Sequence, residues 1–316
     1  MKRWLWVAFV IALCAACLMG ATAINPLNMT AVEHDILLNL RLPRVLFGAV
    51  IGAMLGLSGS VYQLTLKNPL ADSFTTGAAS SAALGAILAI SFGAPAPLVP
   101  CCALVTGLLG LTLVYRLSLT NGFINPVTMI LAGIVMNIVA SAVISFSKYF
   151  FEESISSIVF WLMGGFFIVS WGRLLVCALV FLVVYLSFRQ RALHLNLLAL
   201  DECSAQTMGV NVPRLRSFAF VAATLLVAIA VSYTGIIGFV GLIVPHIARS
   251  LFGSDMRHNL LYSSLLGALL LVIADAVARV IIPGGAELPV GIITALLGGI
   301  FFLYLLQTRR ERFWHG

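Results

Sequence analysis

The chain has 316 residues, of which 61% are hydrophobic and 9% are charged, and its formal net charge is +7. Soluble domains carry about 25% charged residues, so this composition excludes a soluble protein and predicts one that crosses the membrane many times. The Lys and Arg residues are scattered between apolar segments, which argues against a nucleic-acid partner and fits cytoplasmic loops rich in positive charge. No connection between apolar segments has room for a separate soluble domain, so residues 1–316 are predicted to form a single transmembrane domain.

Ten apolar segments along the chain are predicted to be membrane-spanning helices. They cover residues 4–24, 44–64, 74–92, 98–117, 125–147, 172–188, 216–233, 239–252, 259–282 and 288–306. The first, within residues 1–24, imitates a signal peptide but is long enough to cross, so it is interpreted as a retained helix. The apolar segment 155–169 is interrupted by Gly164 and Gly165 and is interpreted as a half-buried outer segment, and 239–252 is short and contains Pro245.

The distribution of basic residues predicts the orientation. With ten crossings and the N-terminus inside, 13 of the 18 Lys and Arg residues fall on the inner side. The outer side receives Arg41, Arg44, Lys148, Arg173 and Arg279. Because cytoplasmic loops are enriched in positive charge, both termini are predicted to be cytoplasmic.

The segment 44–64 carries glycines at every fourth position, Gly48, Gly52 and Gly56, and a further one at Gly59. Spacing of four places the first three on one helix face, where small residues let another membrane helix approach closely. We expect this helix to be packed tightly inside the bundle.

Three arginines occupy the outer ends of predicted helices, where orientation alone disfavours them: Arg41, Arg44 and Arg279. They could anchor helices at the membrane surface, and Asp275, four residues before Arg279, could pair with it on one helix face. They could also form a basic outer surface that receives an acidic partner. Sequence spacing leaves these alternatives open.

Two polar connections are long enough to carry structure. The inner one, Arg189 to Arg216, is predicted to contain a helix on the cytoplasmic face, which begins at Asp201 and Glu202 and ends at Gly209. Such a helix is either a link or a handle for another protein. The outer connection, Asn25 to Leu40, is predicted to be a loop with a solvated His34.

Motifs for an internal energy source are missing. The sequence contains no Gly-Lys dipeptide, so it has no Walker A loop for ATP, and no His-x-x-x-His pair. Cys14 and Cys17 have the spacing of a redox or metal pair, but they lie in an apolar segment with no His or Cys partner nearby, so a packing role is favoured. A passive permease driven by a separate ATPase is therefore favoured. The alternative is an ion-coupled secondary transporter centred on Asp275. An intramembrane enzyme would need paired catalytic groups, and none are visible.

From Arg41 to Leu306 the chain resembles the permease subunits of type II ABC importers for iron–siderophore complexes, haem and vitamin B12, the FecCD-type permeases. The resemblance rests on nine short motifs in order: Arg41–Arg44, Gly59 with Gln63, Asn68–Asp72, Leu131–Gly133, Trp161–Gly165, Leu198–Leu200 with Met208-Gly209, Gly238–Arg249, Ala274–Arg279 and Glu287–Gly291.

The resemblance implies an all-α permease in the plasma (inner) membrane that works as two copies, most simply a homodimer. Its partners would be a substrate-binding protein and two ATP-binding cassette subunits, which hold the ATP and Mg²⁺, while this chain binds no cofactor or metal. The cargo would be an iron–siderophore complex, or else haem or cobalamin.

The resemblance also implies roles for residues. Docking of the binding protein would use Arg41, Arg44 and Arg279. The inner gate would use Asn68, Leu70, Pro126 and Val127, although at 125–127 the chain lacks, in register, the small hydroxyl residues common in relatives. Coupling to the ATPase would use Leu200, Asp201, Glu202, Ala205, Met208 and Gly209. Pro245, His246 and Arg249 would have a structural role near the cytoplasmic end.

Overall fold

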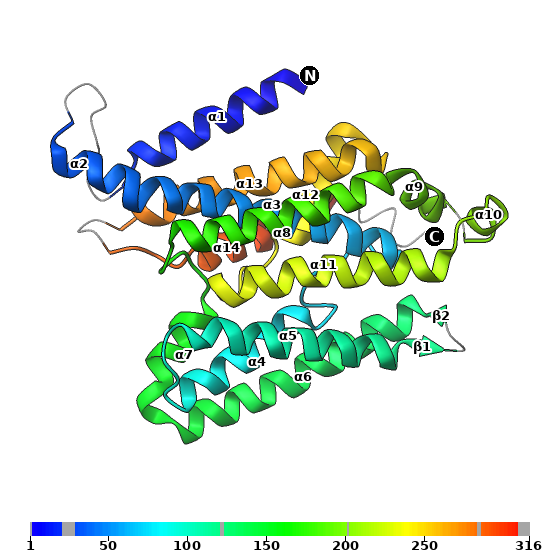
Figure 1. The fold of residues 1–316 in the computed structure, drawn as a ribbon, viewed down its shortest axis with the longest axis horizontal. Coiled ribbons are helices and arrows are strands. Elements are labelled where there is room, and N and C mark those ends of the chain that lie inside the picture. The colour runs from blue at the N-terminus through cyan, green and yellow to red at the C-terminus, as the bar shows by residue number, and fades with distance from the viewer. Residues whose placement is uncertain (1, 21–28, 121–122, 201, 283–285, 309–316) are drawn as a thin grey trace.

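The computed structural model describes residues 2–20, 29–120, 123–200, 202–282 and 286–308. They form an all-α bundle whose long helices run along one common axis (Figure 1). The helices are α1 (Lys2–Leu18), α2 (Ala31–Ile36), α3 (Leu42–Thr65), α4 (Ala78–Ser91), α5 (Leu98–Leu117), α6 (Pro126–Phe150), α7 (Ile155–Leu162), α8 (Trp171–Gln190), α9 (Ala192–Leu200), α10 (Glu202–Thr207), α11 (Val212–Thr234), α12 (Val240–Phe252), α13 (Met256–Val280) and α14 (Val290–Thr308). A π-helical turn (Leu37–Arg41) precedes α3, a 3-10 turn (Glu152–Ser154) precedes α7, and the short strands β1 (Leu119–Thr120) and β2 (Phe123–Ile124) pair antiparallel.

Apolar helices coincide with all ten predicted segments. Six, by length and composition, can cross a membrane: the continuous helical stretch Ala31–Thr65, α5, α6, α8, α11 and α13. Four shorter apolar helices, α1, α4, α12 and α14, account for the rest. The number of crossings and the sidedness of the termini stay predictions. We call the end that carries α9, α10 and the start of α1 the inner end, and the opposite one the outer end (Figure 1).

Helix α3 is the central element. In its most apolar stretch 89% of the residues are buried inside the chain, and it packs against α13, α11, α12 and α8. A Cβ atom on Gly52 would lie 2.2 Å from the Gly267 carbonyl oxygen of α13, and one on Gly56 would lie 2.3 Å from the Ser263 carbonyl oxygen. Backbone therefore meets backbone at Gly52 and Gly56, as the spacing of four predicted, whereas a Cβ atom on Gly48 would lie 3.0 Å from the Phe166 ring.

The entry to α3 differs from the sequence prediction. The expected loop 25–40 is helical from Ala31 onward, and residues 21–28 lie outside the described part of the chain. Thr30 and Glu33 form a capping box: the Glu33 amide donates to Thr30 Oγ1 at 3.3 Å and the Thr30 amide donates to Glu33 Oε2 at 2.8 Å. Pro43 lacks the N–H that would donate to the carbonyl of residue 39 in a regular α-helix, and its ring crowds that carbonyl. The π-helical turn Leu37–Arg41, directly before α3, widens the helix at this point.

Two further segments refine the prediction. Residues 155–162 form the short helix α7, which Gly164 ends with a positive φ of 66°. The inner connection contains two helices, α9 and α10, where the sequence analysis expected one, and α11 begins at Val212, earlier than expected. Pro213 lies in the first turn of α11, where proline is well tolerated. The Asn211 side chain caps the helix by accepting from the Arg214 amide at 3.1 Å.

Candidate functional site

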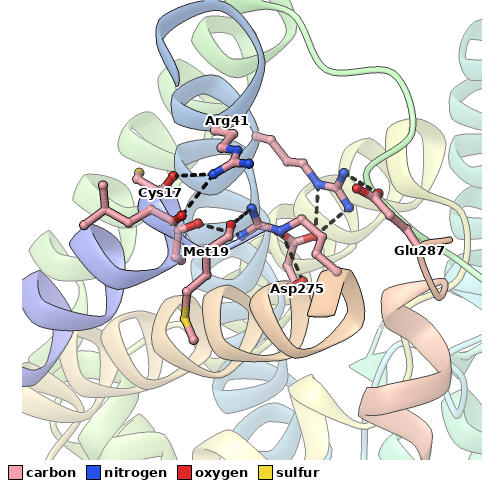
Figure 2. Close-up of polar contacts among 9 residues, drawn as sticks. Cys17, Met19, Arg41, Asp275 and Glu287 are labelled. Atoms are coloured by element: carbon pink, nitrogen blue, oxygen red, sulfur yellow. Dashed lines mark hydrogen bonds and ion pairs between the residues drawn. The ribbon is translucent and has the colours of Figure 1, made fainter. Parts of the chain in front are cut away.

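An ion-pair cluster joins three segments at the outer end of the bundle (Figure 2). Arg44, in the first turn of α3, donates from Nε to Asp275 Oδ1 at 3.0 Å, and its Nη2 lies 2.9 Å from the same oxygen. Its Nη1 lies 2.6 Å from Glu287 Oε2, in the connection before α14. Asp275 is 2% exposed, whereas the Glu287 side chain is 40% exposed. The cluster therefore links α3, α13 and the α14 connection at the edge of the bundle.

Asp275 has a second cationic partner. Arg279, one turn further along α13, places Nε 3.0 Å from Asp275 Oδ2. Two guanidinium groups therefore flank one buried carboxylate, which neutralises its charge and fixes its position. Such a carboxylate offers a transported cation no uncompensated charge.

Arg41 and Arg279 also hold the outer end of α1 (Figure 2). Arg41 donates to the Leu18 carbonyl at 3.0 Å, and Arg279 donates to the carbonyls of Met19 at 2.8 Å and Ala16 at 2.9 Å. The last carbonyls of a helix lack intrahelical donors and carry the negative end of its dipole. The two arginines therefore cap α1, a contact that the sequence analysis did not anticipate because residues 16–19 carry no polar signal.

The structure brings the three predicted docking arginines together, but it does not present them equally. Arg41 and Arg279 are buried, at 9% and 3% exposure, while the Arg44 side chain is 18% exposed. All three line an outer pocket of about 410 Å³, together with Glu287 and the loop Phe166–Val169. Docking through these residues stays a prediction, and Arg44 is the one whose guanidinium is best placed to meet a partner.

A second polar junction joins α3 to α12 near the inner end. Pro245 lacks an N–H, which leaves the Gly241 carbonyl in α12 without its usual intrahelical donor. Gln63 Nε2 donates to the carbonyl oxygens of Gly241 at 3.4 Å and Leu242 at 3.2 Å instead, and Arg249 in turn donates to Gln63 Oε1. These contacts connect α12 to α3, and the structural role expected of Pro245 and Arg249 stays a prediction.

His246, the remaining member of that predicted group, packs at the α12–α14 contact. Its ring lies edge-on to Phe301, with centroids 5.7 Å apart.

The first predicted gate segment follows α3. Asn68 Oδ1 accepts from the Leu70 amide at 2.9 Å, which closes a tight turn, and the Leu70 side chain is 48% exposed. The loop then folds back against α6, where Asn137 Nδ2 donates to the Phe74 carbonyl at 2.6 Å. The turn thus holds the backbone at Leu70 and leaves its apolar side chain about half exposed.

The second predicted gate segment begins α6. Asn125 caps this helix by accepting from the Val127 amide at 2.9 Å, and Pro126 is its first residue. The Val127 side chain is 66% exposed. Whether the two segments close together stays a prediction.

The predicted coupling residues lie on α10 and around it. Ala205 is buried, Met208 is 64% exposed, and Gly209 ends the helix with a φ of 83°. Asp201 lies outside the described residues, as do the side chains of Leu200 and Glu202.

A clamp that the sequence analysis missed joins α9 to α13. Asn196 Nδ2 donates to Asp255 Oδ1 at 2.7 Å, and Asn196 Oδ1 accepts from the Met256 amide at 2.7 Å. Asp255 also caps α13 by accepting from the Arg257 amide at 2.9 Å. Hydrogen bonds from the Arg257 side chain, then from Asn196, lower the pKa of Asp255. Asp255 before an apolar run is a cap signal, but no local pattern identifies Asn196 as its partner.

The sequence comparison decides the family. The model of the FecCD transport family matches residues 7–308. The chain belongs to the FecCD transport family. It is a multi-pass protein of the inner membrane, in a family of ABC importer permease subunits, and the predicted fold is confirmed.

Individual relatives match over nearly the whole chain. The hemin transport system permease protein HmuU of Yersinia pestis is 35% identical over 99% of this chain and 96% of its own length. The vitamin B12 import system permease protein BtuC of Vibrio vulnificus is 35% identical over 96% of this chain and 95% of its own. A metal-chelate type ABC transporter solved in an inward-facing conformation is 34% identical, covers 97% of this chain and 98% of its own, and superposes with a TM-score of 0.90.

Proposed function

We propose that this chain is the membrane-spanning subunit of an ATP-driven importer that carries a metal chelate into the cytoplasm, either an iron–siderophore complex, haem or cobalamin. The observation that carries the proposal is the TM-score of 0.90 over 97% of the chain to a metal-chelate type ABC transporter, at 34% identity. The hemin and vitamin B12 permeases among the relatives support the same cargo class.

In this proposal two copies of the chain form the path, and each gate alternates between open and closed. ATP and Mg²⁺ are bound by two partner ATPase subunits, which grip α10 on the inner face. A substrate-binding protein docks at the outer pocket, where Arg44 offers a partly exposed guanidinium. Helix α13 connects these regions, because Asp255 and Asn196 tie its start to α9 and its outer turns carry Asp275.

Ion-coupled transport centred on Asp275 is the weaker hypothesis. Its carboxylate lies 2.9–3.0 Å from two arginine side chains and is 2% exposed. A coupling site needs a carboxylate that gains and loses its cation during the cycle. Two fixed guanidinium groups, one of them from its own helix, do not favour such exchange.

The test is reconstitution of the permease with its ATPase subunits in vesicles. Binding protein loaded with a ferric siderophore, haem or cobalamin is added outside, and uptake is measured with and without ATP. We expect uptake of one chelate class that requires ATP. A variant with residues 201–208 replaced by a Gly/Ser linker should hydrolyse ATP without transport. Accumulation by the permease alone, driven by a proton or sodium gradient, would overturn the proposal.

A further inference from the structure

A basic pocket lies at the inner end of the bundle. Of the predicted docking, gate and coupling residues, Gly209 alone borders it among the described residues. It has a volume of about 520 Å³ and lies between the end of α8, the start of α9 and the start of α11. Its polar lining is Gln190, Arg191, His194, Asn211 and Arg214. None of the described residues that line it is acidic. Its electrostatics therefore favour an anion.

The two arginines are held differently. The Arg191 guanidinium stacks over the Phe218 ring, 4.4 Å from its centroid, and donates from Nη1 to the Ser187 carbonyl at 3.0 Å. Arg191 is thus fixed at the pocket wall. Arg214 has an exposed side chain, although its backbone amide is bound by the Asn211 cap. One positioned cation and one exposed cation can close on a phosphate from two sides.

The wall of the pocket continues into apolar surface that faces outward from the bundle. Leu215 and Phe218 line the pocket itself. One turn further into the membrane, Leu186 on α8 and Val221 on α11 are 47% and 41% exposed. Residues three or four apart share a helix face, so Leu186 extends the face of Gln190 and Val221 extends that of Phe218. An occupant with an anionic head and an apolar tail matches both parts.

We propose that this pocket binds the phosphate headgroup of an anionic phospholipid, whose acyl chains lie along α8 and α11. Basic pockets between membrane helices on the cytoplasmic side bind such headgroups. The apolar continuation favours a lipid over free phosphate. Helix α10 extends beyond the start of α11 at the inner end of the bundle (Figure 1), and Gly209, which ends it, borders the pocket. The membrane lipid would thereby hold the segment next to the coupling helix.

The experiment uses the whole transporter complex, with its ATPase subunits, in mixed phosphatidylglycerol and phosphatidylcholine of matched chains. Lipid retained after gentle detergent extraction is counted by native mass spectrometry. Wild-type complex should retain phosphatidylglycerol in preference to phosphatidylcholine. Arg191→Gln with Arg214→Gln should weaken this preference about five-fold for each arginine removed. Because Arg191 also packs on Phe218, Arg214→Gln alone is the second variant.

The matched control is Arg116→Gln, which removes an exposed arginine from the inner end of α5, outside the pocket. It should retain lipid as wild type does. Equal retention of the two lipids, or an equal loss in the Arg116 control, would overturn the proposal. Displacement of the lipid by millimolar inorganic phosphate would instead identify a free-anion site. Loss of the ATPase subunits from the Arg214 variant with lipid retention unchanged would identify a protein-binding surface, and both results would refute the lipid assignment.

Discussion

The packing of α3 against α13 makes a sharp prediction for Gly52→Ala. The added Cβ atom would lie 2.2 Å from the Gly267 carbonyl oxygen and 2.9 Å from the Ala268 Cα atom. Carbon and oxygen atoms normally stay more than 3 Å apart, so the two helices must separate by roughly 1 Å. The obstacle is backbone, which cannot rotate away as a side chain would. Overpacking of this kind costs about 1–3 kcal/mol, whereas alanine regains at most about 1 kcal/mol of helix propensity, so the clash dominates.

The assay is thermal unfolding of the purified permease in nanodiscs, with Gly172→Ala as the matched control. Gly172 is also a helical glycine without a positive φ, and a Cβ there would meet nothing within 4 Å. We expect Gly52→Ala to lower the Tm by about 4 °C, for a net cost of about 2 kcal/mol, and Gly172→Ala to leave it unchanged or slightly raised. Equal Tm values for the two variants would refute the close-packing argument.

Three further predictions concern the polar clusters. Arg44→Gln should lower the free energy of unfolding by about 2–3 kcal/mol, because it leaves the buried Asp275 with one cation. Adding Asp275→Asn should restore part of the lost Tm, and no recovery in the double variant would contradict the pairing. Asn196→Ala should lower the amount of cargo moved per ATP hydrolysed in vesicles, because α9 loses two hydrogen bonds to the start of α13; an unchanged ratio would argue against that route. The pKa of Asp255 is lower in the folded protein than its ordinary value of 3.8, so the ionised carboxylate stabilises the fold at pH values above 3.8, and this contribution is lost progressively as the pH falls below that value. The Tm difference between wild type and Asp255→Asn should therefore be constant from neutral pH to about pH 5 and shrink below about pH 4; a difference that does not change with pH would contradict this assignment.

The sequence predicted the features that repeat along the chain. Each of the ten apolar segments contains an apolar helix, because hydropathy over about 20 residues reports the bilayer directly. The glycine spacing of 44–64 predicted the backbone contacts at Gly52 and Gly56. Gly209 marked the end of α10 because only glycine readily adopts its φ of 83°.

The sequence could not predict the long-range polar partners. Arg44 and Glu287 are 243 positions apart, and no periodicity links them. Backbone carbonyls carry no sequence signal at all, so the capping of α1 by Arg41 and Arg279 was invisible. The local Thr30–Glu33 capping box was readable, and it would have replaced the expected outer loop with a helix.

Helix α13 connects the inner and outer ends of the bundle, where the proposed ATPase and binding-protein contacts lie. Its 25 residues span about 37 Å, from the Asn196 clamp near the coupling helix to the outer pair of Asp275 and Arg279. It meets α3 through backbone at Gly52 and Gly267, and around that contact Val45, Ala49 and Ala53 of α3 pack in one buried cluster with Ala268 and Val272 of α13. Close packing of this kind resists separation of the two helices, because the contacts between them would be lost. A displacement imposed on α9 would therefore move α13 and α3 together, because the Arg44–Asp275 pair also joins the two helices at the outer end.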